Sequence, residues 1–246
     1  MTDTPADDLK PSFRGDVTVE LIKHTASDAD VLFAARVSTA GEQSLEELQK
    51  DPERSKGLIN YLMRDRHGSP FEHNSMTFFI SAPIFVFREF MRHRVGWSYN
   101  EESGRYRELE PVFYVPGEDR KLVQQGRPGK YEFVQGTPEQ YKTVTAAMEE
   151  SYRQSYAAYQ EMLAAGVARE VARATLPVGL FSSMYATCNA RSLMHFLGLR
   201  TQHELAKVPS FPQREIEMVG EKMEAEWARL MPLTHAAYNA NGRVAP

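Results

Sequence analysis

Hydrophobic side chains recur with two different periods along this chain, and the periods predict its elements. Alternating apolar and polar residues are typical of a half-buried strand, whereas apolar residues three and four apart are typical of a helix. Leu58 and Leu62 follow the helical spacing, and Lys50 and Glu53 fall among the solvated positions. The elements predicted in the first half are a strand over 17–22, a helix that begins at Asp28 or Asp30 and ends near Ser38, a helix over 45–66, a strand over 76–81 and a helix over 83–94.

Cap and turn residues mark the elements of the second half. Thr137 and Gln140 have the spacing of a capping box, with Pro138 between them, so a long helix should begin here and stop at Gly166. Asn189 is placed to cap a later helix. The remaining expected elements are a polar loop over 96–106, a strand near 113–115, a surface loop over 116–136, a short helix over 169–176, a strand over 181–187, helices over 190–200 and 213–230, and an irregular tail from 232.

Together these elements predict one α+β domain with a mainly antiparallel sheet flanked by long helices. We find no internal repeat and no linker that would split the chain. Residues 1–15 should form a polar N-terminal tail, 16–231 the domain and 232–246 a C-terminal tail. A chain of 246 residues can bury a sizeable core without covalent staples.

Charge and cysteine content exclude some classes of protein. The 29 basic and 33 acidic residues give a net charge of −4, which argues against a general nucleic-acid binder. The single cysteine, Cys188, cannot form an intramolecular disulfide, and a reducing, cytoplasmic location is expected. The first fifteen residues lack the apolar region of a signal peptide, and apolar runs such as 84–87 are far too short to span a membrane.

Arginine, and no lysine, supplies the positive charge between residues 88 and 107. This stretch contains Arg-His-Arg at 92–94 and Ser-Gly-Arg at 103–105, with hydroxyls, an amide and two carboxylates between them. Guanidinium groups bind oxyanions through two parallel hydrogen bonds, so this density of donors suits phosphates and polar heterocycles. The simpler alternative is a solvated basic helix end beside a serine-containing turn.

The same string resembles the signature of the flavin-dependent thymidylate synthases, which is Arg-His-Arg, seven or eight residues, Ser, and Arg two positions later. Eight residues separate Arg94 from Ser103 here, the longer variant, with Trp97 in the added position. Three more segments resemble the family in the same order, so the resemblance covers roughly residues 30–220. They are His-Gly-Ser-Pro-Phe-Glu-His at 67–73, Arg-Glu-Val-Ala-Arg at 169–173 with Leu-Pro at 176–177, and the helix that follows Asn189 as far as Arg200.

The resemblance implies an activity, the reductive methylation of dUMP to dTMP. FAD would be the redox cofactor, 5,10-methylenetetrahydrofolate the carbon donor and NADPH the reductant, and no metal would take part. The resemblance also implies a homotetramer whose active sites are shared between subunits. The expected partners are therefore dUMP, folate and further copies of the chain, with no nucleic acid and no membrane.

The resemblance also assigns three sets of site residues. The catalytic set is Arg200, Ser103 and His67. The cofactor-binding set is Ser38, Ser69, Glu72, Arg92, His93, Arg94, Val95, Asn189, Arg191 and His195. The substrate-binding set is Glu89, Arg92, Glu101, Glu102, Ser103, Gly104, Arg105, Arg173 and Arg200.

Histidines and paired arginines leave alternatives open. His67 and His73 could be metal ligands, but their spacing across a Ser-Pro turn is not a standard ligand spacing. His73 is equally compatible with a buried, hydrogen-bonded histidine. Arg169 and Arg173 are spaced for one helix face, where either a bound anion or simple exposure would relieve their repulsion.

The helix over 190–200 should carry polar groups on two faces. Arg191 and His195 share one face and Arg200 lies on the opposite one, so the helix could serve two ligands. Cys188 ends an apolar run with no histidine or lysine adjacent, which favours a small buried side chain over a nucleophile. Without a nucleophilic cysteine, the cofactor should carry the difficult chemistry.

Two other classes of function compete with this hypothesis. An RNA-binding protein would use the same arginines with Trp97, but Glu101 and Glu102 interrupt the basic stripe. A metallohydrolase would use the histidines and would need tightly bound metal. Residues 201–212 look like an insertion relative to the family, and the sequence leaves open whether His203 or a neighbour touches the cofactor.

Overall fold

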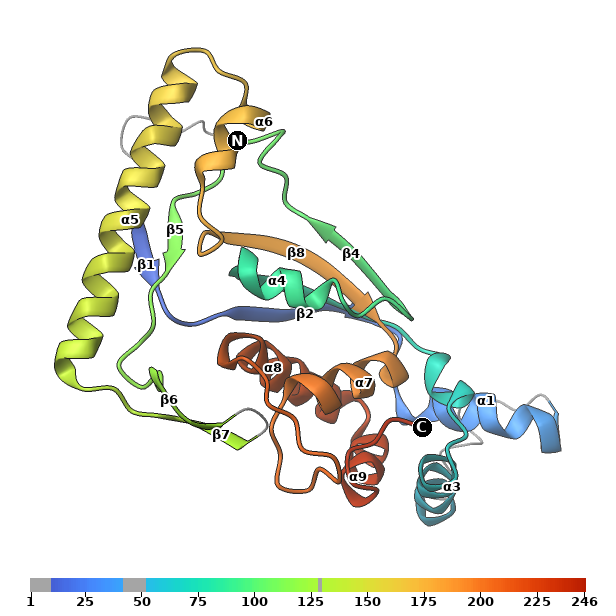
Figure 1. Cartoon of the computed structure of the whole chain (residues 1–246). Coiled ribbons are helices and arrows are strands. Elements are labelled where there is room, and N and C mark those ends of the chain that lie inside the picture. Colours follow the sequence, from blue (N-terminus) through green and yellow to red (C-terminus); the bar gives the residue numbers. More distant parts are fainter. Residues whose placement is uncertain (1–9, 42–51, 128–129) are drawn as a thin grey trace. The chain divides into compact units, whose positions relative to one another are not determined.

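The computed structural model describes residues 10–41, 52–127 and 130–246, and they form the helices and strands drawn in Figure 1. Contacts divide these residues into two compact units, and the chain passes between the units several times. Unit 1 takes in the described residues up to Asp16, Ala82–Phe87 and Glu102–Ser182. Unit 2 takes in Val17–Ser81, Arg88–Glu101 and Ser183–Pro246.

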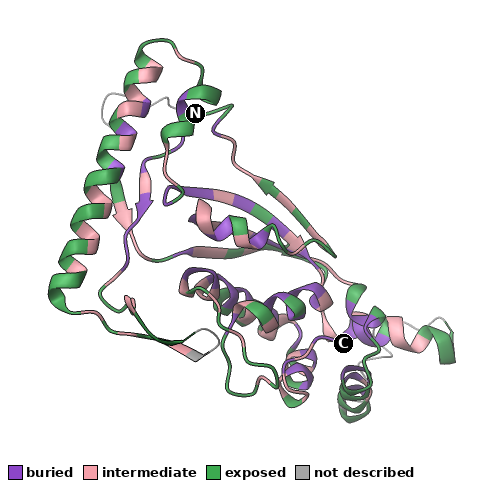
Figure 2. Ribbon diagram, viewed as in Figure 1, coloured by how far each residue is buried: buried purple, intermediate pink, exposed green. Residues whose placement is uncertain are grey.

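A four-stranded sheet in the order β2-β3-β8-β4 lies mostly in unit 2. β2 (Thr18–His24) pairs antiparallel with β3 (Met76–Pro83), and β4 (Trp97–Glu101) pairs antiparallel with β8 (Phe181–Cys188). The side chains of β3 and β8 are mostly buried, as expected of the two central strands (Figure 2). The predicted α+β class with a mainly antiparallel sheet is therefore confirmed.

β4 occupies part of the polar loop predicted over 96–106, so this prediction was wrong for residues 97–101. Trp97 and Tyr99 are half-buried and alternate with exposed Ser98 and Asn100, which is the period of a strand covered on one face. The two rings stack with their centroids 5.7 Å apart. Polar composition concealed a strand whose pairing partner, β8, lies far along the chain.

Helices of unit 2 pack around fully buried aromatic side chains, among them Phe196, Trp227 and Tyr238. α8 contacts α7, α9 and β2, and α3 contacts α9. The predicted helices over 190–200 and 213–230 are confirmed, while residues 45–51 of the helix predicted over 45–66 lie outside the described residues. The helices and the 3₁₀ turn of this unit are α1 (Asp28–Ala40), α3 (Pro52–Arg64), η2 (Ser69–Glu72), α7 (Ala190–Arg200), α8 (Arg214–Leu230) and α9 (Pro232–Ala240).

Ser27, rather than Asp28 or Asp30, caps α1. Asp30 completes the capping box from the third helical position, where its carboxylate accepts the Ser27 N–H at 2.7 Å. Asp28 instead accepts the N–H groups of Leu233 and Thr234 at 2.8 and 2.9 Å and joins the start of α1 to the start of α9. The cap prediction was wrong because a long-range partner occupies Asp28.

α9 replaces the irregular tail predicted from residue 232, so that prediction was wrong as well. Ala237 and Tyr238 are buried, and the Tyr238 hydroxyl donates to the Met194 carbonyl at 3.0 Å. A helix this short is marginal alone, and packing against α3 and α8 stabilises it. Local sequence signals are too weak to predict such a helix.

α4 (Ile84–Phe90) ends earlier than the helix predicted over 83–94. The Tyr99 hydroxyl lies 3.1 Å from the Phe90 carbonyl and 2.9 Å from the His93 carbonyl, and it supplies a donor where the helical ladder stops. Arg92, His93 and Arg94 consequently lie in the turn after α4 and not on a helix end.

α5 (Pro138–Ala164) is the long helix of unit 1, and it begins with the predicted capping box. Thr137 Oγ1 accepts the Gln140 N–H at 3.3 Å, and Gln140 Oε1 accepts the Thr137 N–H at 2.8 Å. Gly166 follows the helix with a φ of 81°, as expected of a glycine stop. The buried side chains of α5 are Tyr152, Tyr156 and Tyr159, and most of its remaining surface is exposed (Figure 2).

Short strands replace two segments of unit 1 that the sequence predicts to be irregular. β1 (Ser12–Arg14) pairs parallel with β5 (Val112–Tyr114), so part of the predicted polar tail over 1–15 is a strand, and residues 1–9 lie outside the described residues. The predicted loop over 116–136 contains a hairpin of β6 (Val123–Arg127) and β7 (Lys130–Val134). β6 is largely exposed and polar, so no apolar alternation marks it.

Candidate functional site

A pocket of about 340 Å³ lies in unit 2 beside the first turns of α7. Its volume is near the lower end of the range for small-molecule sites. Two arginines, two histidines, a carboxylate and an indole ring line it, and they come from η2, from the turn after α4, from β4 and from α7. The lining residues are Glu72, His93, Arg94, Val95, Trp97, Arg191, Ser192 and His195.

Side-chain caps fix the start of α7 against the turn after α4. Asn189 Oδ1 accepts the Ser192 N–H at 2.9 Å, which confirms the predicted cap, and Asn74 Oδ1 accepts the Ala190 N–H at 2.8 Å. Ser192 Oγ then donates to the Val95 carbonyl at 2.9 Å. These hydrogen bonds therefore fix the first turn of α7 against one wall of the pocket.

Gly96 makes this close approach possible. Its φ is +69°, in the left-handed region that side chains other than glycine rarely adopt. A Cβ at this position would lie 2.1 Å from Ser192 Oγ, which is too close for any contact without movement. Both the backbone conformation and the packing of the turn therefore require glycine here.

Three neighbouring groups hold Arg191 in the first turn of α7. Its Nη1 pairs with the Glu72 carboxylate at 2.8 Å, and its Nε donates to the Pro246 carbonyl at 2.7 Å. The guanidinium also packs over Gly68, where a Cβ would lie 2.6 Å from Arg191 Cζ. The orientation of this arginine is therefore fixed before any ligand binds.

Arg200 is joined to the same pocket through His93. Arg200 Nε donates to His93 Nε2 at 3.1 Å, and its Nη1 forms an ion pair with the half-buried Glu89 carboxylate. Arg191 and Arg200 do lie on different faces of α7, as predicted, but His93 both lines the pocket and contacts Arg200. His93 thus lies next to both of the ligand positions that the sequence predicted on α7.

His93 is neutral at ordinary pH. Arginine has only donors, so His93 Nε2 must accept and the ring proton must sit on Nδ1. Burial, together with the positive charge of Arg200, lowers the pKa of His93 to about 4. Burial also raises the pKa of Glu89, although the Arg200 guanidinium opposes this effect.

The lowered pKa of His93 predicts that stability falls in mild acid. The unfolded chain binds the histidine proton near pH 6.5 and the folded chain only near 4, so the free energy of unfolding should decrease by up to about 3 kcal/mol between these values. Urea denaturation of wild type and His93→Gln at pH 7 and pH 5 measures this. A glutamine can still accept from Arg200 but does not titrate, so equal losses in both proteins would contradict the prediction. The raised pKa of Glu89 acts in the opposite direction, and both proteins contain this residue.

Positive charge concentrates around the pocket. Partial burial, followed by the nearby charges of Arg191 and Arg66, lowers the pKa of His195. Arg94 is exposed at the rim and adds a further guanidinium. A site of fixed arginines with neutral imidazoles suits an anionic ligand that also carries a polar heterocycle.

In unit 1, the predicted substrate-binding segment forms a tight turn at Ser103. The Ser103 carbonyl accepts the Tyr106 N–H at 3.0 Å, and its hydroxyl accepts the Arg105 N–H at 3.3 Å. Gly104 is buried against Arg173, where a Cβ would lie 3.4 Å from Arg173 Cδ. The structure therefore brings together Ser103, Gly104, Arg105 and Arg173 of the predicted substrate set.

Acidic partners already hold the arginines of this turn. Arg105 forms an ion pair with Glu170 at 2.5 Å, and Arg107 forms one with Glu102 at 3.1 Å. An anion that bound here would have to compete with the exposed carboxylate of Glu170 and the partly buried one of Glu102, and ion pairs near the surface contribute little. Glu101, another residue of the predicted substrate set, is the last residue of β4 in unit 2.

The arginine pair at 169 and 173 does not share a regular helix face. α6 (Arg169–Ala172) is a single turn, and the 3₁₀ turn η3 (Arg173–Thr175) continues it. Both arginines are exposed. The helix predicted over 169–176 therefore exists only as two short turns, and the exposure of both arginines limits the repulsion that the spacing suggested.

Six of the ten predicted cofactor-binding residues line the pocket, which leaves four elsewhere. Asn189 caps α7, and exposed Ser38, Ser69 and Arg92 lie outside the lining. Sequence reasoning assigned no binding role to Ser192, although it directly follows a motif arginine. The six are Glu72, His93, Arg94, Val95, Arg191 and His195.

The sequence left the roles of His67 and His73 open, and neither histidine is buried. His67 is exposed and lies against Tyr61, with ring centroids 5.6 Å apart, and His73 is exposed, so the alternative of a buried His73 was wrong. Within the described ranges, no three His, Cys, Asp or Glu side chains gather as a metal site would need. In the same ranges, no helix has the length and apolar content needed to cross a bilayer.

Cys188 is buried at the end of β8, where it is paired with Trp97 of β4. Burial raises the pKa of its thiol well above the usual value, so the nucleophilic thiolate is disfavoured. The predicted role as a small buried side chain is confirmed.

Hydrogen bonds within unit 2 anchor the segment 201–212, the apparent insertion. The Lys207 N–H donates to the Gly242 carbonyl at 2.9 Å, and Ser210 Oγ donates to the Thr201 carbonyl at 2.5 Å. His203 is exposed, and no residue of this fully described segment lines the pocket.

Comparisons with known proteins agree with the family resemblance seen in the sequence. The chain matches the model of the family "Thymidylate synthase complementing protein" over residues 20–233. A flavin-dependent thymidylate synthase of Streptomyces avermitilis is 88% identical over 246 residues, the full length of both chains. One of Tropheryma whipplei is 57% identical over 239 residues, covering 97% of this chain and 98% of the relative.

Solved structures resemble the whole chain as well. A UMP/dUMP methylase, PolB from Streptomyces cacaoi, bound with 5-Br dUMP has a TM-score of 0.89 and 55% identity, and covers 95% of this chain and 99% of that chain. The same methylase bound with 5-Br UMP has a TM-score of 0.88 and 53% identity, and covers 96% and 99%. The chain belongs to the thymidylate synthase complementing protein family and is an enzyme of the flavin-dependent thymidylate synthase type.

Proposed function

We propose that this enzyme methylates dUMP reductively to dTMP, with FAD as cofactor, 5,10-methylenetetrahydrofolate as carbon donor and NADPH as reductant. The observation that carries the proposal is the pocket beside α7. Segments far apart in the sequence meet there, and each contributes a residue of the family's motifs: Glu72, His93 and Arg191. A cytoplasmic location is proposed with it, in keeping with the lone buried thiol of Cys188.

The residues of the pocket fit part of a flavin dinucleotide. Arg94 and Arg191 offer guanidinium groups for phosphate or ring oxygens, and Trp97 offers an aromatic edge for a ring system. A dinucleotide exceeds a pocket of about 340 Å³, so a neighbouring copy of the chain would complete the site, and we propose the family's homotetramer as the active form. Bound FAD would supply the redox chemistry of the reduction.

Substrate binding is proposed for two groups of residues. Arg200, held by Glu89 and His93, would stabilise negative charge on the pyrimidine and so make its ring carbon more nucleophilic. The Ser103–Arg105 turn, with Arg173 of the same unit, would bind the nucleotide phosphate. Ser103 would act as a hydrogen-bond donor there and not as a covalent nucleophile.

UMP is a second candidate substrate. The PolB methylase is named for both UMP and dUMP, and it was solved with analogues of both. At 55% identity, the same choice has to be tested for this enzyme.

An anaerobic assay tests the proposal directly. Purified protein is mixed with methylenetetrahydrofolate and NADPH, with or without added FAD, and with dUMP or UMP, and methylated nucleotides are measured by mass spectrometry. We expect dTMP to form in an FAD-dependent manner. Methylation of UMP alone would move the substrate to the ribonucleotide, and no product from folded protein would refute the proposal.

Cys188→Ala should leave dTMP formation nearly unchanged. The thiol is buried and protonated, so the reaction should not need it, while loss of one sulfur atom from the sheet should cost about 1 kcal/mol of stability. The initial rate and the melting temperature of the variant report the two effects separately. Loss of activity without loss of folding would return the thiol to the mechanism.

A further inference from the structure

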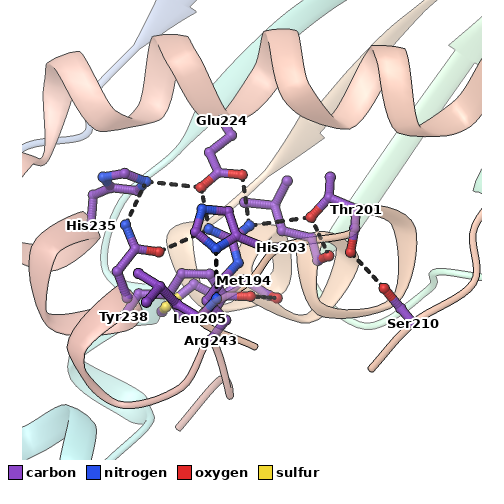
Figure 3. A network of polar contacts seen from close by, with 11 residues as sticks. Met194, Thr201, His203, Leu205, Ser210, Glu224, His235, Tyr238 and Arg243 are labelled. Atoms are coloured by element: carbon purple, nitrogen blue, oxygen red, sulfur yellow. Dashed lines mark hydrogen bonds and ion pairs between the residues drawn. The ribbon is translucent and has the colours of Figure 1, made fainter. Parts of the chain in front are cut away.

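The segment Arg243–Pro246 lies outside residues 20–233, which match the family model, yet it is largely buried. Arg243 anchors it through a two-pronged ion pair with Glu224 of α8, at 2.6 and 2.7 Å (Figure 3). The same guanidinium donates to Asn239 at 2.8 Å and to the Thr201 hydroxyl at 3.2 Å. These bonds fix where the following residues run.

Glu224 is fully committed to this anchor. It also bonds to His235 at 2.8 Å, and the hydrogen bonds from Arg243 and His235 outweigh burial and lower the pKa of Glu224 to about 2 (Figure 3). This partly buried carboxylate, with its three hydrogen bonds, is therefore ionised at neutral pH, where it can hold Arg243.

Two main-chain oxygens of the segment then accept hydrogen bonds from Arg191, which lines the pocket, and from Arg66, which lies outside the lining. The Pro246 carbonyl accepts Arg191 Nε at 2.7 Å, and the Ala245 carbonyl accepts Arg66 Nη1 at 3.3 Å. Arg191 lines the pocket, and Arg66 is close enough to His195 to lower the pKa of that pocket residue. One end of the segment is thus tied to α8 and the other to the pocket.

Backbone strain is concentrated at the same contacts. In the described part of the chain, the non-glycine residues with positive φ are Arg66, at 64°, and Arg243, at 55°. Such conformations persist only where the surroundings enforce them, and they tend to cluster at functional sites. Here both strained residues are arginines that hold this segment.

We propose that Arg243–Pro246 is a positioning element of the cofactor pocket, which fixes the Arg191 guanidinium for the ligand through the Pro246 carbonyl. The inference rests on the proposed FAD site. Glu72 and the Pro246 carbonyl occupy two different edges of the guanidinium, so removing one of them leaves Arg191 free to rotate about the other. No residue of the segment itself needs to touch the ligand.

A variant lacking Ala245 and Pro246 tests the proposal with two readouts. The first needs no cofactor: the Nε–H signal of Arg191 in ¹⁵N-resolved NMR, assigned by its loss in Arg191→Lys, should be protected from exchange in wild type and lost in the deletion. The second is FAD binding, which should weaken about tenfold or more, as expected for a lost hydrogen bond to a charged group. The melting temperature of the ligand-free protein is recorded for each variant.

Matched variants keep the test decisive if the deletion folds poorly. Arg66→Gln removes the bond to Ala245 and the positive charge near His195, and should weaken FAD binding by about two- to fivefold. Arg229→Gln, which breaks an exposed ion pair with Glu226 on α8, should change neither readout.

A retained Arg191 signal in the deletion, or a lost signal with unchanged FAD affinity, would overturn the proposal. Wild type that binds no FAD would overturn the proposed function instead, and the Arg191 signal would still decide whether the segment holds this side chain.

Discussion

Replacing Arg200 by alanine is expected to lower kcat/KM for dUMP by about 10²–10³-fold. The proposed contact with the pyrimidine is lost, and so is the donor that orients the His93 ring at 3.1 Å. The half-buried Glu89 also loses its cation, and because burial already raises the pKa of this carboxyl, it should take up a proton more readily. Steady-state kinetics over a range of dUMP concentrations measure the loss.

Two controls separate chemistry from folding at Arg200. Arg200→Lys keeps one positive charge but replaces the planar guanidinium, whose separate nitrogens bond Glu89 and His93, by a single nitrogen, so it should recover only part of the activity. Arg200→Ala combined with Glu89→Gln removes the uncompensated carboxylate, and should regain stability but not activity. If Arg200→Ala keeps the wild-type kcat/KM, this arginine is not a substrate ligand.

Local signals in the sequence predicted the starts of two helices correctly. The capping box of Thr137 and Gln140 and the cap of Asn189 are found as expected, because each uses hydrogen bonds that span only three residues. Asp28 shows the limit of this reasoning. It has the chemistry of a cap, but α9 supplies distant N–H partners that no local pattern reveals.

Elements that depend on distant partners were missed. β4 has the composition of a loop, and its pairing with β8 makes it a strand. α9 is too short for a clear periodic pattern and is stabilised by packing against α3 and α8. Both errors have the same physical origin, since tertiary contacts override weak local propensity.

The candidate site was predictable in its residue types more than in its geometry. The family resemblance grouped Arg191, His195 and His93 in one predicted site, and they line one pocket, but the sequence placed His93 on a helix end and not in a turn. The contact between Arg200 and His93 joins the two faces of α7 and requires the fold. No motif marks Pro246, whose contribution is a backbone carbonyl that every residue type possesses.

Gly96→Ala is expected to have the largest effect on stability, with a loss of about 2–5 kcal/mol. About 1–2 kcal/mol would come from placing an L-residue at a φ of +69°. A further cost of about 1–3 kcal/mol would come from the clash, since the new Cβ would lie 2.1 Å from Ser192 Oγ. Because Ser192 would have to move, its bond to the Val95 carbonyl should break, and FAD binding should weaken with it.

Gly166→Ala is the matched control for this variant, because Gly166 also has a positive φ, of +81°, but no atom lies within 4 Å of the position that a Cβ would take. It should show the strain without the clash, so its free energy of unfolding should fall by only about 1–2 kcal/mol and FAD binding should not change. Adding Ser192→Gly to Gly96→Ala removes the clashing hydroxyl, and should recover part of the lost stability if the contact is the cause. Equal losses for Gly96→Ala and Gly166→Ala in urea denaturation would mean that strain alone explains the glycine. The turn after α4 would then not depend on close packing against α7, and another contact would have to stabilise the pocket wall.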